Sequence, residues 1–459
     1  MSPFLKPSRI AFCGIVFCIL TGAINLDIIF YNMKTLLEKI LARLAKAIVR
    51  KYSPKIVGIT GSMGKTSAKE AIYAVLKNKF CVRRNIKNYN NEIGVPLTVI
   101  GSESGGRSIR GWVAVFLKAM KLILMTANDY PEILILEMGA DKPGDIEYLV
   151  NYFPCFAGVV TKIGPAHLEA FKTVENIARE KQKIVTHLNK DGFAILNYDD
   201  PLVREMHKRV KAKVIFFGYH DEAMVRSIDL AQQGEGLDLS GIKFKIAYGG
   251  SAVPVFLPGV VGAHQINSAL AAVAVGIAFG MNLIEISEGL KDYKTPKGRM
   301  NLIEGRNTLI IDDTYNSSPR AASAALETLA KLNIKQVKRK VAILGDMLEL
   351  GDYTDEAHYA LGRKAVEAGV DRLICVGKNR AKIAEGARTG GLASEQIVEY
   401  LDSASALEKI NSIISAEDLI LIKGSQGARM ERIVKALMKD PARAPELLVR
   451  HGIGWENKN

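Results

Sequence analysis

The strongest constraint on the fold is a short segment near residue 60. An apolar, β-branched run at 55–60 (KIVGIT) is followed at once by the turn GSMGKT at 61–66, which leads into a helical stretch from Lys65 to Leu76. Strand, glycine-rich turn and helix in this order are typical of a phosphate-binding loop. Glycines let backbone N–H groups face phosphate oxygens, and the start of the helix adds partial positive charge. The segment therefore predicts an α/β domain with a mainly parallel sheet that binds a nucleotide.

The residue types within the turn suit particular tasks. Lys65 can reach the β- and γ-phosphates, and Thr66 can bind magnesium. The turn departs from the common pattern G-x-x-x-x-G-K-[ST], because Ile59 stands where the first glycine would be. By itself the turn would also suit a kinase, a transporter or a GTPase. The rest of the phosphate cradle is expected from four small residues, Gly61, Ser62, Gly64 and Ser67.

Two further predicted strands lead into residues that suit a nucleotide site. The strand Ile133–Leu136 is followed by Glu137, and the strand Ala157–Thr161 leads into the loop that carries His167. Ligands of parallel α/β sheets lie at the carboxyl ends of the strands, where a carboxylate can hold magnesium. Taken alone, Glu137 could merely cap the next turn, and a single histidine is more often structural. Their positions after strands favour a role in binding.

These motifs and several later ones, in this order, resemble those of the Mur ligases of peptidoglycan synthesis. The resemblance runs from about Ser53 to Met438, and the order is more specific than any single motif. The runs NNEIGVP and GDMLELG indicate the branch that adds D-alanyl-D-alanine to a UDP-muramoyl-tripeptide. The motifs are TGSMGKTS (60–67), NYNNEIGVPLT (88–98), LEMGADKPGDI (136–146), TKIGPAHLEAF (161–171), LNYDDP (196–201), HQINSALAA (264–272), GRM (298–300), IDDTYNSSP (311–319), LGDMLELG (344–351) and IKGSQGARM (422–430).

The resemblance implies ATP and Mg²⁺ as cofactors and gives roles to individual residues. Lys65 and Thr66 would hold the ATP phosphates and magnesium, and Glu137 and His167 would be metal ligands. Lys181 stands where the family has a lysine carbamylated by CO₂, which turns a cation into a carboxylate-like bridge between metals. Without the resemblance, Lys181 would be interpreted as an exposed helical lysine. Lys65, Lys181 and His167 are thus the expected catalytic residues.

Most of the other implied contacts come from the C-terminal half of the chain. Asn267 resembles the residue that contacts adenine, and Arg299 and Asp313 resemble those that contact the phosphates and ribose across a domain junction. Tyr315 and Asn316 belong to the same nucleotide-facing loop. Contacts to the substrates are expected from four residues, Asn91, Lys423, Ser425 and Arg429.

The implied reaction needs no nucleophilic side chain. A substrate carboxylate attacks the γ-phosphate to give an acyl phosphate, and an amine then displaces phosphate. Both steps build negative charge, which magnesium, Lys65 and helix N-termini would stabilise. The expected protein is an ATP-dependent ligase that joins D-alanyl-D-alanine to a muramoyl peptide. Two alternatives stay open: a related ligase that forms another peptide or polyglutamate-type bond on a non-UDP or membrane-linked substrate, and a membrane-tethered nucleotide-binding module without catalysis.

Some positions depart from the family pattern. Relatives carry a domain of about a hundred residues before the loop, which binds the uridine nucleotide, and the roughly fifty residues here are too few for it. We therefore expect this domain to be lacking. Gln265 replaces the usual asparagine, Ser317 and Ser318 replace Ala-Asn, and Gln426 replaces the usual arginine. Glutamine cannot bind a carboxylate bidentately as a guanidinium does, so we expect Arg429 to compensate.

The alternation of strands and helices restarts after Arg299, which predicts a second, Rossmann-like α/β domain. The segment YKTPKG at 293–298 is interpreted as a hinge. We divide the chain into an N-terminal helical segment (1–52), a central ATP-binding domain (53–297) and a C-terminal domain (298–459). The strands expected in the last domain are near 309–312, 340–344, 372–376 and 419–422.

The N-terminal segment favours a membrane surface as a partner. No charged residue occurs from Ile10 to Leu26, a run somewhat short for a spanning helix, which needs about twenty residues. Residues 33–52 resemble a basic amphipathic helix on an anionic membrane, although a helix packed on the body would show the same pattern. Met33 could also be the true start, which would remove the apolar run. The expected location is the cytoplasm, with residues 10–51 attached to the inner face of the cytoplasmic membrane.

Composition restricts the partners further. A formal net charge of +14 favours anionic ligands. No arginine-rich tract, aromatic platform or zinc-finger spacing occurs, so no nucleic acid is expected. The five cysteines lack C-x-x-C spacing, which argues against a disulfide framework and a zinc site. The expected partners are small molecules, a muramoyl peptide and a D-amino-acid dipeptide.

Overall fold

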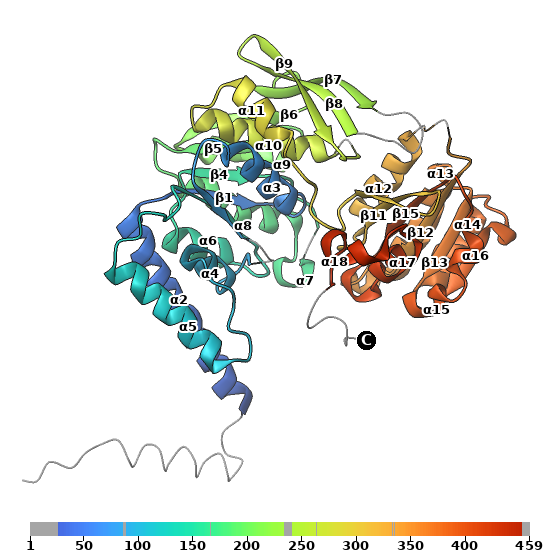
Figure 1. The fold of residues 1–459 in the computed structure, drawn as a ribbon, viewed down its shortest axis with the longest axis horizontal. Helices are drawn as coiled ribbons and strands as arrows, with labels where there is room; N and C mark the ends of the chain where they lie inside the picture. Colours follow the sequence, from blue (N-terminus) through green and yellow to red (C-terminus); the bar gives the residue numbers. More distant parts are fainter. Residues whose placement is uncertain are drawn as a thin grey trace, which may run out of the picture.

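The computed structural model describes residues 26–85, 89–165, 167–233, 241–262, 264–332, 334 and 336–451. All but the last residue of the apolar run at 10–26 lies outside this described part. The chain forms two sheets, each with helices on both faces, and two long helices extend from one side of the first sheet (Figure 1). This is the α/β architecture that the sequence predicts.

The first sheet has nine strands in the order β2-β3-β1-β4-β5-β6-β7-β8-β9. Neighbours from β2 to β7 run parallel, and β7, β8 and β9 form an antiparallel extension. In β1, Val57 and Ile59 face one core and Ile56 faces the other, as expected for a strand covered on both sides. The strands are β1 (Lys55–Thr60), β2 (Val82–Arg84), β3 (Ile133–Glu137), β4 (Ala157–Val160), β5 (Phe193–Asn197), β6 (Lys213–Gly218), β7 (Val225–Gln233), β8 (Gly241–Tyr248) and β9 (Ser251–Pro258).

Helices cover the two faces of this sheet with different parts of the chain. One face carries α3 (Lys65–Leu76), α10 (His264–Ala278) and α11 (Leu283–Leu290). The other face carries α4 (Gly94–Ile100), α6 (Asp145–Tyr152) and α8 (Val174–Thr186). Three short helices follow strands of the sheet: α7 (Leu168–Phe171), α9 (Pro201–Arg204) and the 3₁₀ helix η1 (Glu205–Arg209).

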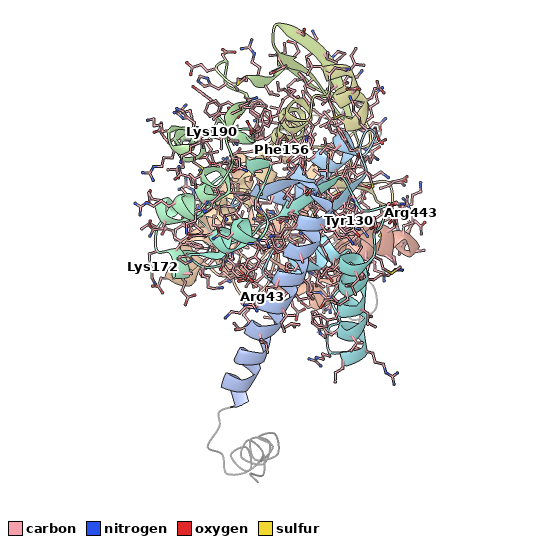
Figure 2. The ribbon with its side chains drawn as sticks, turned by 90° about the vertical axis from the view of Figure 1, so that its left-hand side faces the viewer. Arg43, Tyr130, Phe156, Lys172, Lys190 and Arg443 are labelled. Atoms are coloured by element: carbon pink, nitrogen blue, oxygen red, sulfur yellow. The ribbon has the colours of Figure 1, made fainter. Side chains whose placement is uncertain are left out.

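Two long helices, α2 (Leu26–Tyr52) and α5 (Ile109–Leu124), lie side by side and extend away from the sheet (Figures 1 and 2). Leu41 and Ile48 of α2 are buried in the same core as α4 and α6. Tyr52 donates a hydrogen bond to the Leu122 carbonyl of α5 at 2.9 Å. The C-terminal half of α2 is therefore packed on the body of the protein. Among the helices of the described part, none is long and apolar enough to cross a bilayer.

The second sheet has six strands in the order β10-β11-β15-β12-β13-β14. Only β10 is antiparallel to its neighbour, and the four predicted strands are all present. The proposed division near residue 297 falls between the sheets, but its bounds stay a prediction. The strands are β10 (Asn301–Glu304), β11 (Leu309–Asp313), β12 (Arg339–Gly345), β13 (Arg372–Val376), β14 (Ile397–Tyr400) and β15 (Asp418–Lys423).

Helices also cover both faces of the second sheet. One face packs against α12 (Pro319–Lys331), α13 (Thr354–Glu367) and α14 (Arg380–Thr389). The opposite face packs against α15 (Ser403–Leu407), α16 (Ile410–Ile413), α17 (Glu431–Leu437) and α18 (Ala444–Leu447). Because α12 follows β11 directly, the loop between them lies at the edge of the second sheet that carries Asp313.

Candidate functional site

The glycine-rich turn joins β1 to α3 at the carboxyl edge of the first sheet. Gly61 (φ 148°) lies so close to the end of β4 that a Cβ there would be 2.0 Å from Thr161 Oγ1. Gly64 (φ 82°) is the N-cap of α3 in the left-handed region, which favours glycine. The Thr161 hydroxyl donates a hydrogen bond to the Met63 carbonyl at 2.6 Å. The turn therefore has the compact shape expected of a phosphate loop and is held against β4.

Ser62 of the turn and Ser67 of α3 both form hydrogen bonds within the protein. The Ser62 N–H donates to the Lys162 carbonyl at 2.7 Å, and its hydroxyl donates to the Gly164 carbonyl at 2.9 Å. Ser67 is buried, and its side chain is hydrogen-bonded to Tyr293. Ser62 therefore ties the turn to the segment after β4, whereas Ser67 contacts Tyr293, and the expected nucleotide contacts of both serines stay a prediction.

Lys65 and Lys181 bring two positive charges close together. Lys65 is part-buried and its Nζ donates to the Gly61 carbonyl at 2.8 Å. Loss of hydration lowers the pKa of Lys65, and Glu137 opposes this shift. Lys181 of α8 is buried, and burial followed by the charge of Lys65 lowers the pKa of Lys181 to about 7. Lys181 is thus not an exposed helical lysine, and its amine lies within electrostatic reach of Lys65.

Thr66 and Glu137, two of the expected magnesium ligands, lie in contact. The Thr66 hydroxyl donates to Glu137 Oε1 at 3.3 Å. Lys69, which sequence reasoning missed, is buried 3.8 Å from Glu137 Oε2 and donates to the Asn85 carbonyl at 2.8 Å. The sequence feature that could have identified Lys69 is its spacing of four residues from Lys65, which places both lysines on the same face of α3. Magnesium is usually held by one or two carboxylates together with water and substrate phosphates, so this pair of oxygen donors fits Mg²⁺.

His167 lies just before α7, beside Asp141. Its side chain is exposed, and Nε2 is 3.6 Å from Asp141 Oδ1. Over the described ranges, no three His, Cys, Asp or Glu side chains lie close enough together to hold a metal ion. Only Glu137 and His167 of the expected set are residues of these types, so metal binding by Thr66, Glu137, His167 and Lys181 stays a prediction.

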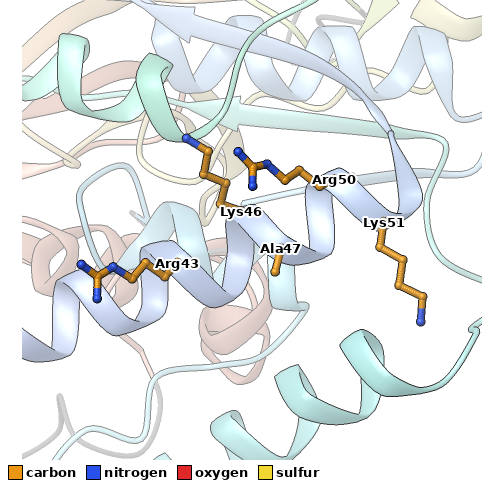
Figure 3. A pocket seen from close by; sticks show the side chains of 5 residues that line it. All are labelled: Arg43, Lys46, Ala47, Arg50 and Lys51. Atoms are coloured by element: carbon orange, nitrogen blue, oxygen red, sulfur yellow. The ribbon is translucent and has the colours of Figure 1, made fainter.

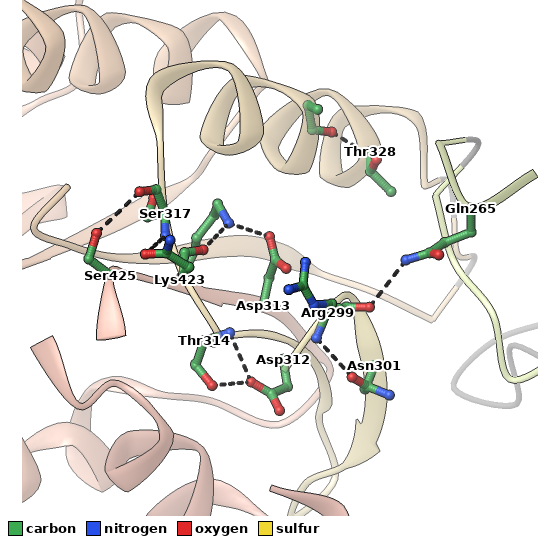
Figure 4. A network of polar contacts seen from close by, with 12 residues as sticks. Gln265, Arg299, Asn301, Asp312, Asp313, Thr314, Ser317, Thr328, Lys423 and Ser425 are labelled. Atoms are coloured by element: carbon green, nitrogen blue, oxygen red, sulfur yellow. Dashed lines mark hydrogen bonds and ion pairs between the residues drawn. The ribbon is translucent and has the colours of Figure 1, made fainter. Parts of the chain in front are cut away.

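Arg299 connects the two sheets at their junction (Figure 4). Gln265 Nε2 donates to the Arg299 carbonyl at 3.3 Å, and the guanidinium lies 4.1 Å from the centre of the Tyr315 ring. Arg299 Nε and Asn267 Oδ1 are buried without a hydrogen-bond partner in the described structure. Buried polar atoms are rarely left unpaired. ATP fits these atoms, because adenine offers an amino group to the amide oxygen and phosphate offers oxygens to the guanidinium.

Lys423 and Ser425 hold the loop after β11 in place. The register of β11 and β15 puts Asp313 opposite Lys423, whose Nζ is 2.6 Å from Asp313 Oδ2 and 2.9 Å from the Asn316 carbonyl. The Ser425 hydroxyl donates to the Ser317 carbonyl at 3.2 Å. Both Lys423 and Ser425 are buried. To contact the amino substrate, Lys423 and Ser425 would have to exchange these bonds for bonds to the substrate. The expected contact therefore stays a prediction.

Arg429 is also engaged by a neighbouring carboxylate. Its Nε donates to Glu431 Oε1 at 2.6 Å, and Arg450 lies 3.0 Å from the other oxygen of Glu431. Arg450 also donates hydrogen bonds to the carbonyls of Thr314, at 3.1 Å, and Tyr315. Sequence reasoning missed Arg450, because no local motif relates it to a loop about 135 residues away. The compensation of Gln426 by Arg429 stays a prediction.

Asn91 lies at the start of α4 and lines a cavity. Its Oδ1 accepts a hydrogen bond from the Gly94 N–H at 3.0 Å. The cavity has a volume of about 210 Å³ and is also lined by Asp141 and by Thr35 and Glu38 of α2. Asp141 contacts His167, so the cavity adjoins the histidine loop. The participation of α2 could not be read from the sequence, because it depends on how the helix packs.

Comparisons with known proteins agree with this arrangement. The family model "Mur ligase middle domain" matches residues 117–276, and "Mur ligase, glutamate ligase domain" matches residues 298–426. The UDP-N-acetylmuramoyl-tripeptide–D-alanyl-D-alanine ligase of Bacillus subtilis is 32% identical over 402 residues, which is 87% of this chain and 79% of the relative. The enzyme of the same name from Escherichia coli is 29% identical, over 86% of this chain and 79% of the relative.

Solved structures give the same result. The crystal structure of MurF from Acinetobacter baumannii has a TM-score of 0.73 at 27% identity and covers 88% of this chain and 81% of its own. The structure of MurF ligase from Thermotoga maritima in complex with ADP has a TM-score of 0.71 at 28% identity, over 88% and 84% of the two chains.

Proposed function

The chain belongs to the Mur ligase family, and from this premise we propose that it joins D-alanyl-D-alanine to a UDP-muramoyl-tripeptide through an acyl phosphate. It is an ATP-dependent ligase of peptidoglycan precursor synthesis that forms a carbon–nitrogen bond and uses ATP and Mg²⁺. The names of the Bacillus subtilis and Escherichia coli relatives support the two substrates.

The observation that carries the proposal is the convergence of basic groups from both sheets. Lys65 and Lys181 lie close enough for their charges to interact, and the charge of Arg299 also reaches Lys65. In the first step a carboxylate oxygen of the acceptor bonds to the γ-phosphorus, and ADP leaves. Negative charge grows on the phosphate oxygens, where Lys65 and Arg299 stabilise it in a partly water-free site.

The second step forms the amide bond. The amine of the dipeptide attacks the activated carbonyl carbon and loses a proton, and inorganic phosphate leaves. Bound Mg²⁺ would supply a Lewis acid for the phosphate oxygens, held by Thr66 and Glu137. A carbamylated Lys181 would add a second anionic ligand. Asn267 would hold adenine, and Asp313 the ribose.

A second candidate keeps the reaction but changes the amino substrate. The observation in its favour is Gln426, which is exposed where the family has arginine, together with Arg429, whose guanidinium is held by Glu431. A non-UDP or membrane-linked acceptor belongs to the same candidate. The non-catalytic module is less well supported, because Lys65, Glu137, His167 and Lys181 are all retained.

We also propose a cytoplasmic location with attachment of residues 10–51 to the inner face of the membrane. The support is the basic surface of α2, where a shallow depression of about 560 Å³ is lined by Arg43, Lys46, Arg50 and Lys51 (Figure 3). Arg43 and Arg50 are exposed there. Basic side chains on an amphipathic helix attract anionic headgroups.

The experiment that tests the reaction is ATP-dependent phosphate release with defined pairs of acids and amines. We expect release with UDP-muramoyl-tripeptide and D-alanyl-D-alanine together and little with either alone. Lys65→Ala should abolish release, whereas Lys190→Ala, at an exposed lysine away from the turn, should not. Release with a different pair would establish the second candidate, and no release with any pair would favour the binding module.

A further inference from the structure

Helix α5 exposes an apolar stripe along its whole length. The exposed side chains recur three or four residues apart and therefore share one face of the helix. They are Ile109 (82% exposed), Val113 (50%), Leu117 (66%), Met120 (42%) and Leu124 (74%). An apolar face of this length on a soluble protein indicates a surface that is covered in the working state.

The opposite face of α5 is already used by the fold. Val115 and Ala119 are buried, and Trp112 and Phe116 pack against the core that α5 shares with α2 and α4. The stripe therefore cannot turn inward without exposing these residues. Its partner must come from outside the described structure.

The charged residues of helix α5 have one sign. Helix α5 carries Arg110, Lys118 and Lys121 and has no acidic residue, and Arg107 lies just before it. Arg107, Arg110 and Lys121 are exposed and form no ion pair with another described residue. An apolar stripe bordered by exposed cations matches the boundary between the acyl chains and anionic headgroups of a bilayer.

Helix α2 also carries exposed apolar and basic side chains. It lies beside α5, and both helices extend on the same side of the molecule (Figures 1 and 2). Leu36 is 59% exposed, and Lys39 and Arg43 are exposed close to it in sequence. The chain before α2 continues into the run from Ile10 to Asn25, which has no charged residue. The length and composition of this adjoining run favour a bilayer over a protein as the occupant.

We propose that the exposed face of α5, together with the exposed cations of α2, is a docking surface for an anionic lipid bilayer. The stripe of α5 lies among the upper acyl chains, and the cations of both helices bind the headgroups. This goes beyond attachment through residues 10–51, because it adds a contact some 60 residues further along the chain and fixes how the first sheet faces the membrane.

The test is binding of the full chain to vesicles of phosphatidylcholine with and without phosphatidylglycerol, measured by co-sedimentation. We expect binding to the anionic vesicles that weakens with salt. Leu117→Glu should weaken it at least about tenfold, because a side chain that would be buried in lipid becomes charged. The matched control is Ile284→Glu, at a 68% exposed apolar residue of α11 away from α5, which should bind as the unaltered protein does. Equal binding by all three proteins, or none to anionic vesicles, would overturn the proposal.

A fluorescence measurement separates a bilayer from other occupants. Relative to the unaltered protein, whose Trp112 and Trp455 give the background emission, the tryptophan added in Leu117→Trp should shift to the blue with anionic vesicles and be quenched by brominated lipid, whereas the one added in Lys190→Trp should respond to neither. Emission of Leu117→Trp that is already blue-shifted without lipid would show that the protein itself, or a second copy of it, covers the stripe. Cover of the stripe by the protein itself and cover by a second copy would each reject the bilayer as the occupant.

The proposal of a docking surface and the proposal of the reaction can be refuted independently of each other. Phosphate release with soluble substrates measures the reaction, and Leu117→Glu should leave it unchanged because α5 lies outside the phosphate loop. An active Leu117→Glu protein with weakened vesicle binding supports the docking surface. An inactive but vesicle-binding unaltered protein would contradict only the proposed reaction.

Discussion

At the scale of single residues, two lysines dominate the electrostatics of the site. Lys65 is placed by the glycine-rich turn, and Lys181 by a helix about 115 residues later. The low pKa of Lys181, about 7, leaves a substantial neutral fraction near neutral pH. Only a neutral amine reacts with CO₂, so the surroundings of Lys181 suit carbamylation.

We expect Lys181→Ala to lower activity by about 100-fold or more, since a charged group that stabilises the transition state is lost. Short carboxylates added to the assay should restore part of the activity, because they can replace the carbamate. Steady-state phosphate release measures both effects. Lys183→Ala, at an ion-paired lysine two residues further along the same helix, is the control and should remain active. Full activity of Lys181→Ala without rescue would reject the carbamate.

Asp312 is a buried carboxyl with an unusual proton affinity. One oxygen accepts hydrogen bonds from the Thr314 N–H at 3.1 Å and hydroxyl at 2.6 Å, and the other has no partner among the described residues. Burial raises the pKa of Asp312 to about 7. In the unfolded chain the same group titrates near pH 3.9. The unfolded state therefore binds fewer protons between these values, and this group makes stability fall as pH rises from about 4 to 7.

We expect Asp312→Asn to remove this dependence, because asparagine keeps the acceptor for Thr314 and cannot ionise. Urea unfolding at pH 5 and pH 8 measures it. The variant should gain stability relative to the unaltered protein at pH 8, and the gain should be smaller at pH 5. The same difference at both pH values would contradict the raised pKa.

At the scale of elements, the loop between β11 and α12 is held from several sides. Lys423 binds it from β15, Ser425 from the loop after β15, and Arg450 from the segment after α18. These contacts fix the backbone that carries Tyr315 and Asn316. A loop so held is preorganised for a ligand, which lowers the entropic cost of binding.

We expect Arg450→Ala to raise the KM for ATP about tenfold with a smaller change in kcat, because it frees two backbone carbonyls of this loop and leaves Glu431 without one partner. Steady-state kinetics with varied ATP distinguishes the two parameters. Arg443→Ala, at an arginine exposed on the surface and paired with Glu446, should leave both unchanged. An unchanged KM in Arg450→Ala would show that the loop keeps its shape without this contact.

At the scale of the whole molecule, the residues expected to contact ATP come from both sheets. Arg299 is tied to Gln265 of α10, and Arg320 of α12 approaches the Ile163 carbonyl at 3.5 Å. Because both units contribute residues expected to contact ATP, their relative position can respond to a ligand that both contact.

We expect ATP with Mg²⁺ to draw the two units together. Small-angle X-ray scattering should show a smaller radius of gyration with nucleotide than without. Asn267→Leu, which removes the expected adenine contact, should need more ATP for the same change. Identical scattering with and without nucleotide would contradict closure.

Much of the fold could be predicted because its signals are local. The turn at 61–66, the buried runs that became β1, β3 and β4, and the second series of strands each occupy a few consecutive residues with a distinctive pattern. Hydrophobic periodicity and glycine conformation depend on a few neighbouring residues, so they can be recognised without knowledge of the remaining chain.

What the sequence alone determined is therefore the class of architecture, the phosphate loop at 61–66 and the family of reactions. The tertiary structure was needed to show that Lys423 forms an ion pair with Asp313, that Arg450 holds the loop after β11, and that α5 exposes an apolar face. These outcomes depend on which elements lie side by side. Burial and pairing are properties of contacts between distant segments, and a one-dimensional pattern does not contain them.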